Sequence, residues 1–525
     1  MRKDSRGRPF TRILIANRGE IALRIIRTCR DLDVETVAVY SDADVDAAHV
    51  SAADDAVRLG PAPAGESYLR ADAIIDAAVA MGAEAIHPGY GFLSERASFA
   101  RAVVDAGLTF IGPRPDAIDA LGDKLAARRT ASDADVPVVP GTFEAAPVDR
   151  PDAIEGIIAA AERIGFPLLV KASAGGGGRG MRRVTTATGL PAALAAGSAE
   201  ARAAFGDGAV YLEREVRPAR HIEVQLLGDA DGTIVALGER DCSIQRRHQK
   251  LVEESPAPGL SRDERVELHE MAVRAARAAG LHNAATAEFL FDPDHRFWFL
   301  EVNARLQVEH GVTELVTDLD LVAEQLFIAA GHPLSERVLA AATAAEDPRR
   351  HAIEIRLAAE DPARDFAPAP GRVGRWSMPA GPGVRVDTAI RPGERVPPEY
   401  DPMIAKVMTV GASREAAIRR MRRALDEVEV TGIQTTLPFD RALVRDPGFL
   451  AADALSIDWV AERWAGAVER GAVRELAASA AARVAATASE AAASDRSPSL
   501  RKDESGRSNG WRAAGRQAMV DRWPR

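Results

Sequence analysis

Polar and apolar side chains alternate along EVNARLQVEH, residues 301–310, without a break as far as Glu309. A period of two is typical of an extended strand, because successive side chains of a strand point to opposite faces. One face carries a carboxylate, an amide, a guanidinium, a second amide and a second carboxylate, and the other face is apolar. An ordinary solvated strand favours threonine and scattered charges, so this face indicates a binding site. The alternative interpretation is a polar sheet edge.

A β-hairpin is predicted directly upstream. The apolar run TAEFLF is followed by the turn-forming DPDH and then by RFWFLE, which ends at Glu301. With the turn centred between Asp294 and His295, Glu288 lies directly opposite Glu301. Two facing carboxylates repel each other unless a cation lies between them. The pair and Asn303 therefore predict an all-oxygen site for Mg²⁺ or Mn²⁺; a slipped register would instead point the glutamates apart.

Lysine is rare in this chain. It occurs only at positions 3, 124, 171, 250, 406 and 502, so nearly all of the 67 basic residues are arginine. A chain with this bias keeps lysine where a compact, rotatable ammonium serves better than a planar guanidinium. The first and last lysines lie in polar ends of the chain. Lys124, Lys171 and Lys250 each lie in a segment suited to anions, and Lys406 follows the sequence YDPM.

A glycine-rich loop follows Lys171. The lysine closes the apolar run FPLLV, and ASAGGGGRGM comes next. The bare N–H groups of such a loop can wrap phosphate oxygens. It is not a Walker A loop, because the lysine precedes the glycines and no Gly-Lys-Ser or Gly-Lys-Thr follows. A glycine run alone is equally consistent with a mobile linker, and the lysine at the strand end favours phosphate binding.

A third segment, ERDCSIQRRHQK, ends at Lys250 and contains four cations and a histidine. A basic surface patch is one interpretation. Nucleic acid is disfavoured as a partner, because the net charge is -10, the isoelectric point is near 5.6 and no aromatic residues alternate with the basic ones. The segment therefore favours a small anion.

Taken together, these segments resemble biotin carboxylase, the ATP-grasp enzyme or domain found in the α chains of acetyl- and propionyl-CoA carboxylases. The resemblance runs from about Arg12 to about Trp464. It rests on five long motifs: IANRGEIA at 15–22, HPGYGFLSE at 87–95, the glycine loop through Met181, residues 240–250 and residues 301–310.

The resemblance implies a role for each matching residue. The nucleotide-binding positions are Lys124, Lys171, Gly176, Gly177, Gly178, Glu213, Arg214, Val216, His221, Gln245, His248, Glu288 and Leu290. The metal ligands are Glu288, Glu301 and Asn303, which agrees with the hairpin. The bicarbonate and biotin positions are Lys250, Arg305, Gln307, Val308 and Arg356. The catalytic set is Glu309, the base that deprotonates bicarbonate, with Arg305, Lys250 and Arg356, which steadies the biotin enolate.

The implied reaction suits these residue types. Attack of bicarbonate on the ATP γ-phosphate joins two anions, so positioning and charge cancellation must supply the catalysis. Metal ions and the ammonium groups of Lys171 and Lys250 can cancel charge. Glu309, close to Arg305, is expected to stay ionised and to accept the bicarbonate proton. In the family, carboxyphosphate then yields CO₂ and phosphate, phosphate removes the N1′ proton, and Arg356 is expected to hold the enolate by charge-assisted hydrogen bonds.

The length predicts three or four domains in an α/β chain that is α+β overall. Residues 10–122 predict a Rossmann-like domain of βαβ units, with strands at 12–16 and 35–40 around a helix at 20–32. The NRG turn lacks the dinucleotide glycine fingerprint, so NAD is not expected. The resemblance adds an ATP-grasp domain at 123–340 with a mobile lid near 143–216, and a β-rich C-terminal domain at 345–464.

Residues 465–525 form an alanine-rich and polar tail, predicted as a helix over 466–493 and disorder beyond it. Longer acyl-CoA carboxylase α subunits continue here into a biotinyl domain, whose acceptor lysine stands between two methionines. None of the six lysines has that context. Biotin is therefore expected as a substrate on a carrier protein or biotinyl domain in trans, with a carboxyltransferase subunit as a second partner and a homodimer as the assembly.

The sequence departs from the family pattern at two positions. Ala174 stands where the loop usually has glycine, and Gly311 stands where proline is usual. The first is expected to stiffen the lid and the second to loosen the turn after Glu309. Neither change removes a chemical group.

The composition indicates the cellular compartment of the protein. Cys29 and Cys242 make no disulfide framework, which predicts a reducing cytoplasm. No apolar run approaches membrane-spanning length, and residues 1–10 are polar without a signal-peptide core, so no membrane association is expected.

Two alternative functions stay open at this point. Another ATP-grasp ligase, such as a carbamoyl-phosphate synthetase half or an amino-acid ligase, would share the nucleotide site but would not need residues 305–309 or Arg356. A nucleotide-binding regulatory protein without catalysis is the second alternative. It is disfavoured because the metal ligands, the phosphate lysines and the candidate base are all present.

Overall fold

The computed structural model describes residues 6–146, 151–173, 181–453 and 455–465, together with positions 478 and 482. The chain divides into two compact units, residues 1–466 and 467–525, and all elements named below belong to the first. Gly176, Gly177, Gly178 and Ala174 in the glycine loop, and nearly all of the predicted tail, lie outside the described residues.

The N-terminal part is built on a parallel five-stranded sheet in the order β3-β2-β1-β4-β5, as the Rossmann-like prediction requires. Ile13, Leu14 and Ile15 are fully buried because helices cover both faces of a parallel sheet. The strands are β1 (Arg12–Ile15), β2 (Glu35–Ser41), β3 (Asp55–Gly60), β4 (Ala85–His87) and β5 (Thr109–Phe110). The helices are α1 (Gly19–Asp31), α2 (Ala48–Ala52), α3 (Ala71–Ala80), α4 (Ala97–Asp105) and α5 (Pro115–Gly122).

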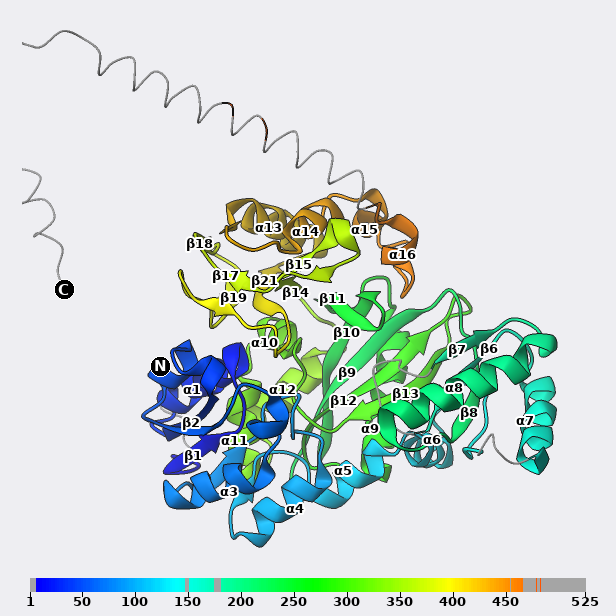
Figure 1. The fold of residues 1–525 in the computed structure, drawn as a ribbon, viewed down its shortest axis with the longest axis horizontal. Helices are drawn as coiled ribbons and strands as arrows, with labels where there is room; N and C mark the ends of the chain where they lie inside the picture. Colours follow the sequence, from blue (N-terminus) through cyan, green and yellow to red (C-terminus); the bar gives the residue numbers. More distant parts are fainter. Residues whose placement is uncertain are drawn as a thin grey trace, which may run out of the picture. The chain divides into compact units, whose positions relative to one another are not determined.

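An antiparallel sheet of eight strands runs through the first unit (Figure 1). It joins the predicted ATP-grasp region to the predicted C-terminal region, because β11 pairs directly with β14. In sheet order the strands are β13 (Phe297–Asn303), β12 (Asn283–Phe291), β9 (Arg220–Gly228), β10 (Ile234–Arg246), β11 (Gln249–Ser255), β14 (His351–Ala358), β21 (Met403–Gly411) and β19 (Val384–Asp387).

Helices pack on this sheet from several parts of the chain. The N-cap Asp123 accepts hydrogen bonds from two N–H groups of α6 (Lys124–Asp133), and a capping box of Ser261 and Glu264 starts α9 (Arg262–Ala278). The short helix α10 (His310–Thr317) contacts β10, β11, β14 and β21. The remaining helices are α11 (Leu321–Ala329), α12 (Glu336–Ala344), α13 (Arg414–Glu427), α14 (Leu437–Leu443), α15 (Pro447–Ala451) and α16 (Trp459–Arg463).

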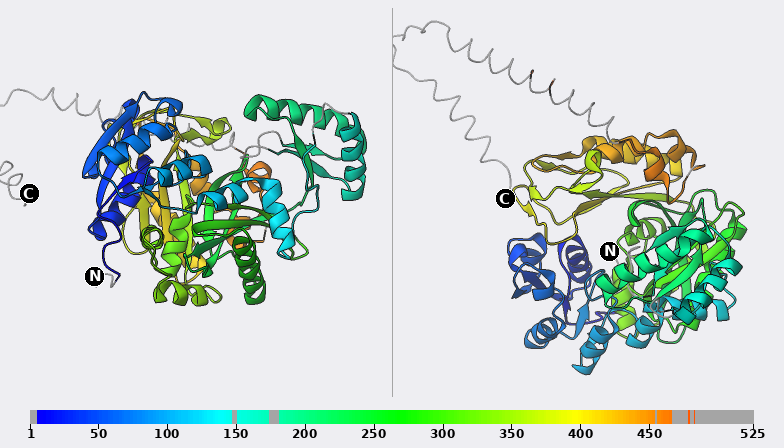
Figure 2. Two further views of the ribbon diagram at one scale, coloured as in Figure 1. Left: turned by 90° about the horizontal axis from the view of Figure 1, so that it is seen from below. Right: turned by 45° about the vertical axis from the view of Figure 1, so that its right-hand side comes forward.

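A small lobe with its own apolar core projects from the rest of this unit (Figure 2, left). Its three-stranded sheet has the order β7-β6-β8. Leu168, Val170, Leu194 and Leu212 are fully buried in it. The elements are α7 (Pro151–Ile164), β6 (Leu168–Ala172), β7 (Arg182–Val184), α8 (Leu190–Phe205) and β8 (Val210–Arg214).

Three strand pairs complete the C-terminal part: β15 (Glu360–Asp361) with β16 (Ala367–Pro368), β17 (Gly371–Arg372) with β20 (Arg395–Val396), and β18 (Trp376–Ser377) with β22 (Glu429–Val430). Each of these strands has only two residues. Among the described residues, every helix is too short or too polar to span a bilayer.

The predicted hairpin is present, with one difference in its turn. Glu288 pairs with Glu301 across β12 and β13, as predicted. The register shifts by one between Glu288 and Phe289, which pairs with Phe299. The turn is therefore centred on Asp294, and a bulge at Leu300 restores the expected pair.

The prediction of a continuous strand to Glu309 is wrong. Strand β13 ends at Asn303, and a turn leads from there to α10, which begins at His310. The Arg305 N–H donates to the Asn303 carbonyl (3.0 Å), and the His310 N–H donates to the Gln307 carbonyl (3.3 Å). The alternation of polar and apolar residues does not by itself require a strand. Because β13 is an edge strand and β12 pairs with it no further than Asn303, the chain is free to turn after that residue.

Candidate active site

A cavity of about 1230 Å³ opens where the N-terminal part, the small lobe and the eight-stranded sheet meet. Polar side chains from every part line it. They include Glu20, Tyr90, Lys124, Lys171, His221, Gln245, His248, Lys250, Glu288, Glu301, Asn303, Arg305, Gln307 and Arg356, with Leu290 and Val308 as apolar neighbours. The structure thus brings together most of the residues that the sequence assigned to separate motifs.

Lys250 lies at the centre of the cavity on β11. Its Nζ donates to Glu223 Oε2 (2.5 Å), Glu309 Oε1 (2.7 Å) and Glu288 Oε1 (3.0 Å). Burial alone would lower the pKa of this ammonium, but the three carboxylates hold the pKa well above its usual value. Lys250 therefore stays charged and ties β9, β12 and the turn before α10 together.

Glu309 lies fully buried between two cations. Lys250 contacts one carboxylate oxygen, and Arg356 Nη2 donates to the other at 2.8 Å. Burial would raise the pKa of Glu309, but Lys250, Arg356 and Arg240 outweigh it and hold the pKa well below the usual range. The carboxylate is thus ionised at neutral pH, as expected.

Arg305, which the sequence placed close to this carboxylate, interacts with Glu309 through its charge and not through a direct bond. Arg305 does not contact Glu309; its guanidinium donates to Gln307 Oε1 (3.0 Å) and Asn303 Oδ1 (3.1 Å) and pairs with Glu95 (3.1 Å). Because β13 ends at Asn303, the turn separates the two side chains, and β11 and β14 supply the cations instead.

Arg356 is shared by two carboxylates. Its Nε donates to Glu253 Oε1 at 2.6 Å while Nη2 holds Glu309. Burial raises the pKa of Glu253 to about 7, although Arg356 acts in the opposite direction. Glu253 is therefore the weaker acid of the pair, and the negative charge resides on Glu309.

The predicted metal ligands lie on adjacent strands. Glu288 Oε1 accepts from Asn303 Nδ2 (3.0 Å), and Glu301 has Lys124 Nζ at 3.9 Å. Burial and the nearby Glu288 raise the pKa of Glu301, whereas Lys250 and His221 outweigh burial at Glu288 and lower its pKa, so Glu301 is the carboxylate that is short of positive charge. The oxygen ligands and this charge deficit fit Mg²⁺ or Mn²⁺.

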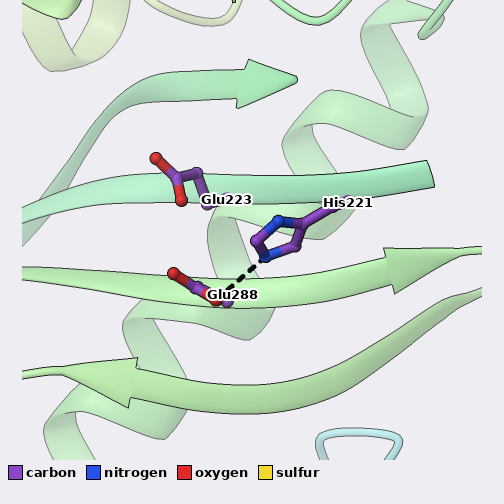
Figure 3. Close-up of side chains that lie close together, drawn as sticks. All are labelled: His221, Glu223 and Glu288. Atoms are coloured by element: carbon purple, nitrogen blue, oxygen red, sulfur yellow. Dashed lines mark hydrogen bonds and ion pairs between the residues drawn. The ribbon is translucent and has the colours of Figure 1, made fainter. Parts of the chain in front are cut away.

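A second acidic group adjoins the metal ligands (Figure 3). His221, Glu223 and Glu288 are buried, and one ligand atom of each lies within 4.8 Å of the others. The His221 ring points at Glu288, with Nε2 at 2.9 Å from Oε2. Sequence reasoning missed Glu223, although it lies two residues after His221 and so shares its face of β9.

Two cations meet at the Glu213 carboxylate, and one of them, Lys171, lines the cavity. Lys171 is ion-paired with Glu213, and the buried Arg128 donates to the same carboxylate at 2.6 Å. Burial lowers and Glu213 raises the pKa of Lys171, with a net rise, so the ammonium is charged. Sequence reasoning did not find Arg128, because nothing in its helical context marks it.

Four assigned residues in the described part of the chain do not line the cavity: Glu213, Arg214, Val216 and Glu309. Arg214 is exposed at the end of β8 and lines a second hollow of about 750 Å³, and Val216 lies half-buried after that strand. Gly311 also differs from expectation, because it lies inside α10 and not in a loosened turn. A Cβ there would meet Met408 Sδ at 2.3 Å, so the glycine admits the Met408 side chain.

The fold and this site define an ATP-dependent ligase of the ATP-grasp class. Residues 123–337 match the family model of the carbamoyl-phosphate synthase L chain ATP-binding domain. Residues 9–118 and 354–462 match those of the biotin carboxylase N-terminal and C-terminal domains. The chain belongs to the biotin carboxylase family.

Individual relatives agree with this assignment. The chain is 49% identical to the biotin carboxylase of Allochromatium vinosum over 84% of its length and 96% of the relative. It is 45% identical to the biotin-dependent acyl-coenzyme A carboxylase alpha3 subunit of Mycobacterium leprae, over 88% of this chain and 76% of that one. The solved biotin carboxylase domain dimer of Hydrogenobacter thermophilus 2-oxoglutarate carboxylase, with MgADP and bicarbonate, has a TM-score of 0.80 at 40% identity, covering 86% and 97%.

Proposed function

We propose that this protein carboxylates biotin on a separate carrier, using ATP and bicarbonate and releasing ADP and phosphate. The observation that carries the proposal is the ionised Glu309 carboxylate, which is held between Lys250 and Arg356. These two cations line the same cavity as Lys171 and Lys124. Another ATP-grasp ligase would need the nucleotide end but not this second anion site.

Bicarbonate is assigned to the region of Lys250, Arg305, Gln307 and Val308, which line the cavity beside Glu309. Glu309 accepts the bicarbonate proton, and the resulting dianion attacks the γ-phosphate to give carboxyphosphate and ADP. Lys250 cancels charge as the two anions approach. The low pKa of Glu309 makes it a weak base, so the proton moves only when the neighbouring cations bind the resulting carbonate dianion in place of the Glu309 carboxylate.

Decomposition of carboxyphosphate gives CO₂ and phosphate, and phosphate takes the N1′ proton of biotin. The enolate oxygen is assigned to Arg356, whose guanidinium already binds two carboxylates through charge-assisted hydrogen bonds. Bond formation between the ureido nitrogen and CO₂ then yields carboxybiotin.

Glu288, Glu301 and Asn303 would hold Mg²⁺ or Mn²⁺, which neutralises phosphate charge when bound. Nucleotide contacts are assigned to Lys124, Lys171, His221, Gln245, His248 and Leu290, which line the cavity, and to Glu213, which positions Lys171. Arg214, Val216 and the glycine loop stay predictions.

The small lobe is assigned as the lid predicted at 143–216, since it has its own core and bears Lys171. The domain boundaries 10–122, 123–340 and 345–464, a homodimer, a carboxyltransferase partner and a cytoplasmic location also stay predictions. The relatives support the assembly, because one is named as an acyl-CoA carboxylase subunit and one as a domain dimer.

The test is ADP release by the full chain with Mg²⁺, with bicarbonate and free biotin each added or omitted. Turnover that needs both supports the proposal. ATP binding without biotin-stimulated turnover, even with a biotinylated carrier, would contradict it and would favour another ATP-grasp ligase or a regulatory protein.

A further inference from the structure

Lys406 is a fully buried lysine (0 % exposed) that none of the roles above includes. Its Nζ donates to the Val308 carbonyl at 2.7 Å, and it lies 3.2 Å from Glu20 Oε1 and 4.0 Å from Asp387 Oδ2. The ammonium thus contacts α1, the turn before α10 and β19. Three segments that are far apart in the sequence meet at one nitrogen atom.

Lys406 is the cross-strand neighbour of a residue already placed in the reaction. It pairs with Arg356 on β14, and the two side chains project from the same face of the sheet. Arg356 holds the Glu309 carboxylate, and Lys406 holds the carbonyl of the preceding residue. Two adjacent cations therefore fix two consecutive residues, one through its side chain and one through its main chain.

The contacts of Lys406 go beyond simple charge pairing. A buried ammonium costs several kcal/mol unless it is paired, and Glu20 and Asp387 supply that pairing. The shortest contact, however, goes to the neutral carbonyl of Val308. An ammonium has three donors that can diverge towards three acceptors, whereas a guanidinium is a planar fork. This explains why an arginine-rich chain keeps a lysine here.

The contact also reaches the other side of the cavity. Glu20 Oε1, which faces Lys406, accepts a hydrogen bond from the Tyr90 hydroxyl, and both residues line the cavity. Lys406 therefore links the N-terminal wall to the turn that bears Val308 and Glu309.

We infer that Lys406 is a positioning residue for the carboxylation reaction. It fixes the turn at residues 305–309 by holding the Val308 carbonyl, so that the bicarbonate region keeps its shape and Glu309 stays in contact with Lys250 and Arg356 beside it. The inference rests on the proposed function, since it assigns Lys406 an effect on bicarbonate and not on ATP.

The test compares Lys406→Met, which removes the donor, with Lys406→Gln, which keeps one. ADP release is measured in full chains against bicarbonate and against ATP, per mole of folded protein. The Met variant is expected to lose about 10²-fold in kcat/KM for bicarbonate, the usual effect of a small misplacement, with an almost unchanged KM for ATP. The Gln variant is expected to lose less.

Arg414→Met is the matched control. Arg414 is another interior cation of this region, bonded to Glu254 and to the carbonyls of Phe449 and Leu450. It contacts none of residues 305–309, so its loss should lower stability without changing the bicarbonate kinetics.

Three results would overturn the inference: unchanged bicarbonate kinetics in folded Lys406→Met, an equal change in Arg414→Met, or equal changes in the kinetics for bicarbonate and ATP. If the Met variant does not fold, the Gln variant decides by the same criteria, and if neither folds the lysine only stabilises the fold. A wild-type chain without bicarbonate- and biotin-dependent turnover would overturn the proposed function as well.

Discussion

The two ends of the eight-stranded sheet carry charge differently. At the β13 end, Glu288 and Glu301 are cross-strand neighbours, and the cation nearest to Glu301 is 3.9 Å away. Towards the β19 end, Asp387 on β19 pairs with Arg385 at 2.6 Å. Arg356 on β14 pairs at 2.8 Å with Glu309, which lies in the turn before α10. At the first end Glu301 is short of positive charge although Lys250 binds Glu288, whereas the carboxylates of the second group are balanced by neighbouring side chains. The site is therefore partly assembled before any substrate arrives.

The largest effect is expected for Glu309→Gln. The amide cannot accept the bicarbonate proton, so bicarbonate-dependent ADP release should fall by at least about 10²-fold, while ATP binding at the other end of the cavity is retained. Steady-state kinetics and nucleotide titration measure the two effects. Unchanged turnover would remove Glu309 as the base.

The matched pair Glu288→Gln and Glu301→Gln tests the charge deficit at the β13 end. Without Mg²⁺, Glu288→Gln should destabilise the fold by about 1–3 kcal/mol, because the Glu288 carboxylate binds Lys250, His221 and Asn303. Glu301→Gln should be neutral or stabilising, because it relieves the burial and repulsion that raise the pKa of Glu301.

Thermal unfolding with and without MgADP distinguishes the two variants. Both should lose much of the stabilisation that MgADP gives the wild type, since each loses a proposed metal ligand. Equal destabilisation of the two variants without metal would contradict the contrast between paired and unpaired carboxylates.

The balanced end predicts a pH effect at Glu253. Its folded-state pKa of about 7 exceeds the usual 4.5, so its contribution to stability is fully present below pH 4.5 and is lost as the pH rises to 7. The Glu253→Gln variant lacks this loss. The melting temperature of the variant should therefore rise relative to that of the wild type between pH 5 and about pH 7, and the difference should stay constant above that pH. A difference that is already constant from pH 5 would show that Glu253 is ionised throughout.

The smallest effect is expected for Gly311→Ala, which tests how closely α10 packs on the balanced end. The added Cβ meets the Met408 thioether, and its flexibility should limit the loss of stability to about 1 kcal/mol. Chemical denaturation measures it. In a Met408→Ala background, Gly311→Ala should change the free energy of unfolding very little. If the two substitutions instead lower stability independently, the strain does not come from the contact with Met408.

Residue patterns predicted much of the cavity because its motifs are local. Two facing glutamates follow from one hairpin, and the pairing of Glu288 with Glu301 is confirmed even though a bulge changes the turn. The lysine census identified Lys171 and Lys250 before any geometry was known. The resemblance supplied the residues that these patterns could not connect.

What could not be predicted depends on contacts between distant strands. The exit of the chain after Asn303 brings Lys250 and Arg356, not Arg305, to Glu309. No local pattern marks Arg128 or Glu253. Their importance comes from distant partners, because Arg128 on α6 binds Glu213 on β8 and Glu253 on β11 binds Arg356 on β14. Lys406 was noticed for its rarity, but its bond to Val308 spans nearly a hundred residues.

The continuity of the sheet has a consequence for how the molecule unfolds. A cut between α12 and β14 would leave β11 and β14 as two long, unprotected edges with unpaired N–H and C=O groups. Neither fragment could satisfy them alone, and each would tend to aggregate through its open edge. The central region should thus melt as one cooperative unit that cuts across the boundary between the matched family domains, with hydrogen exchange equally slow on both sides of the β11–β14 seam.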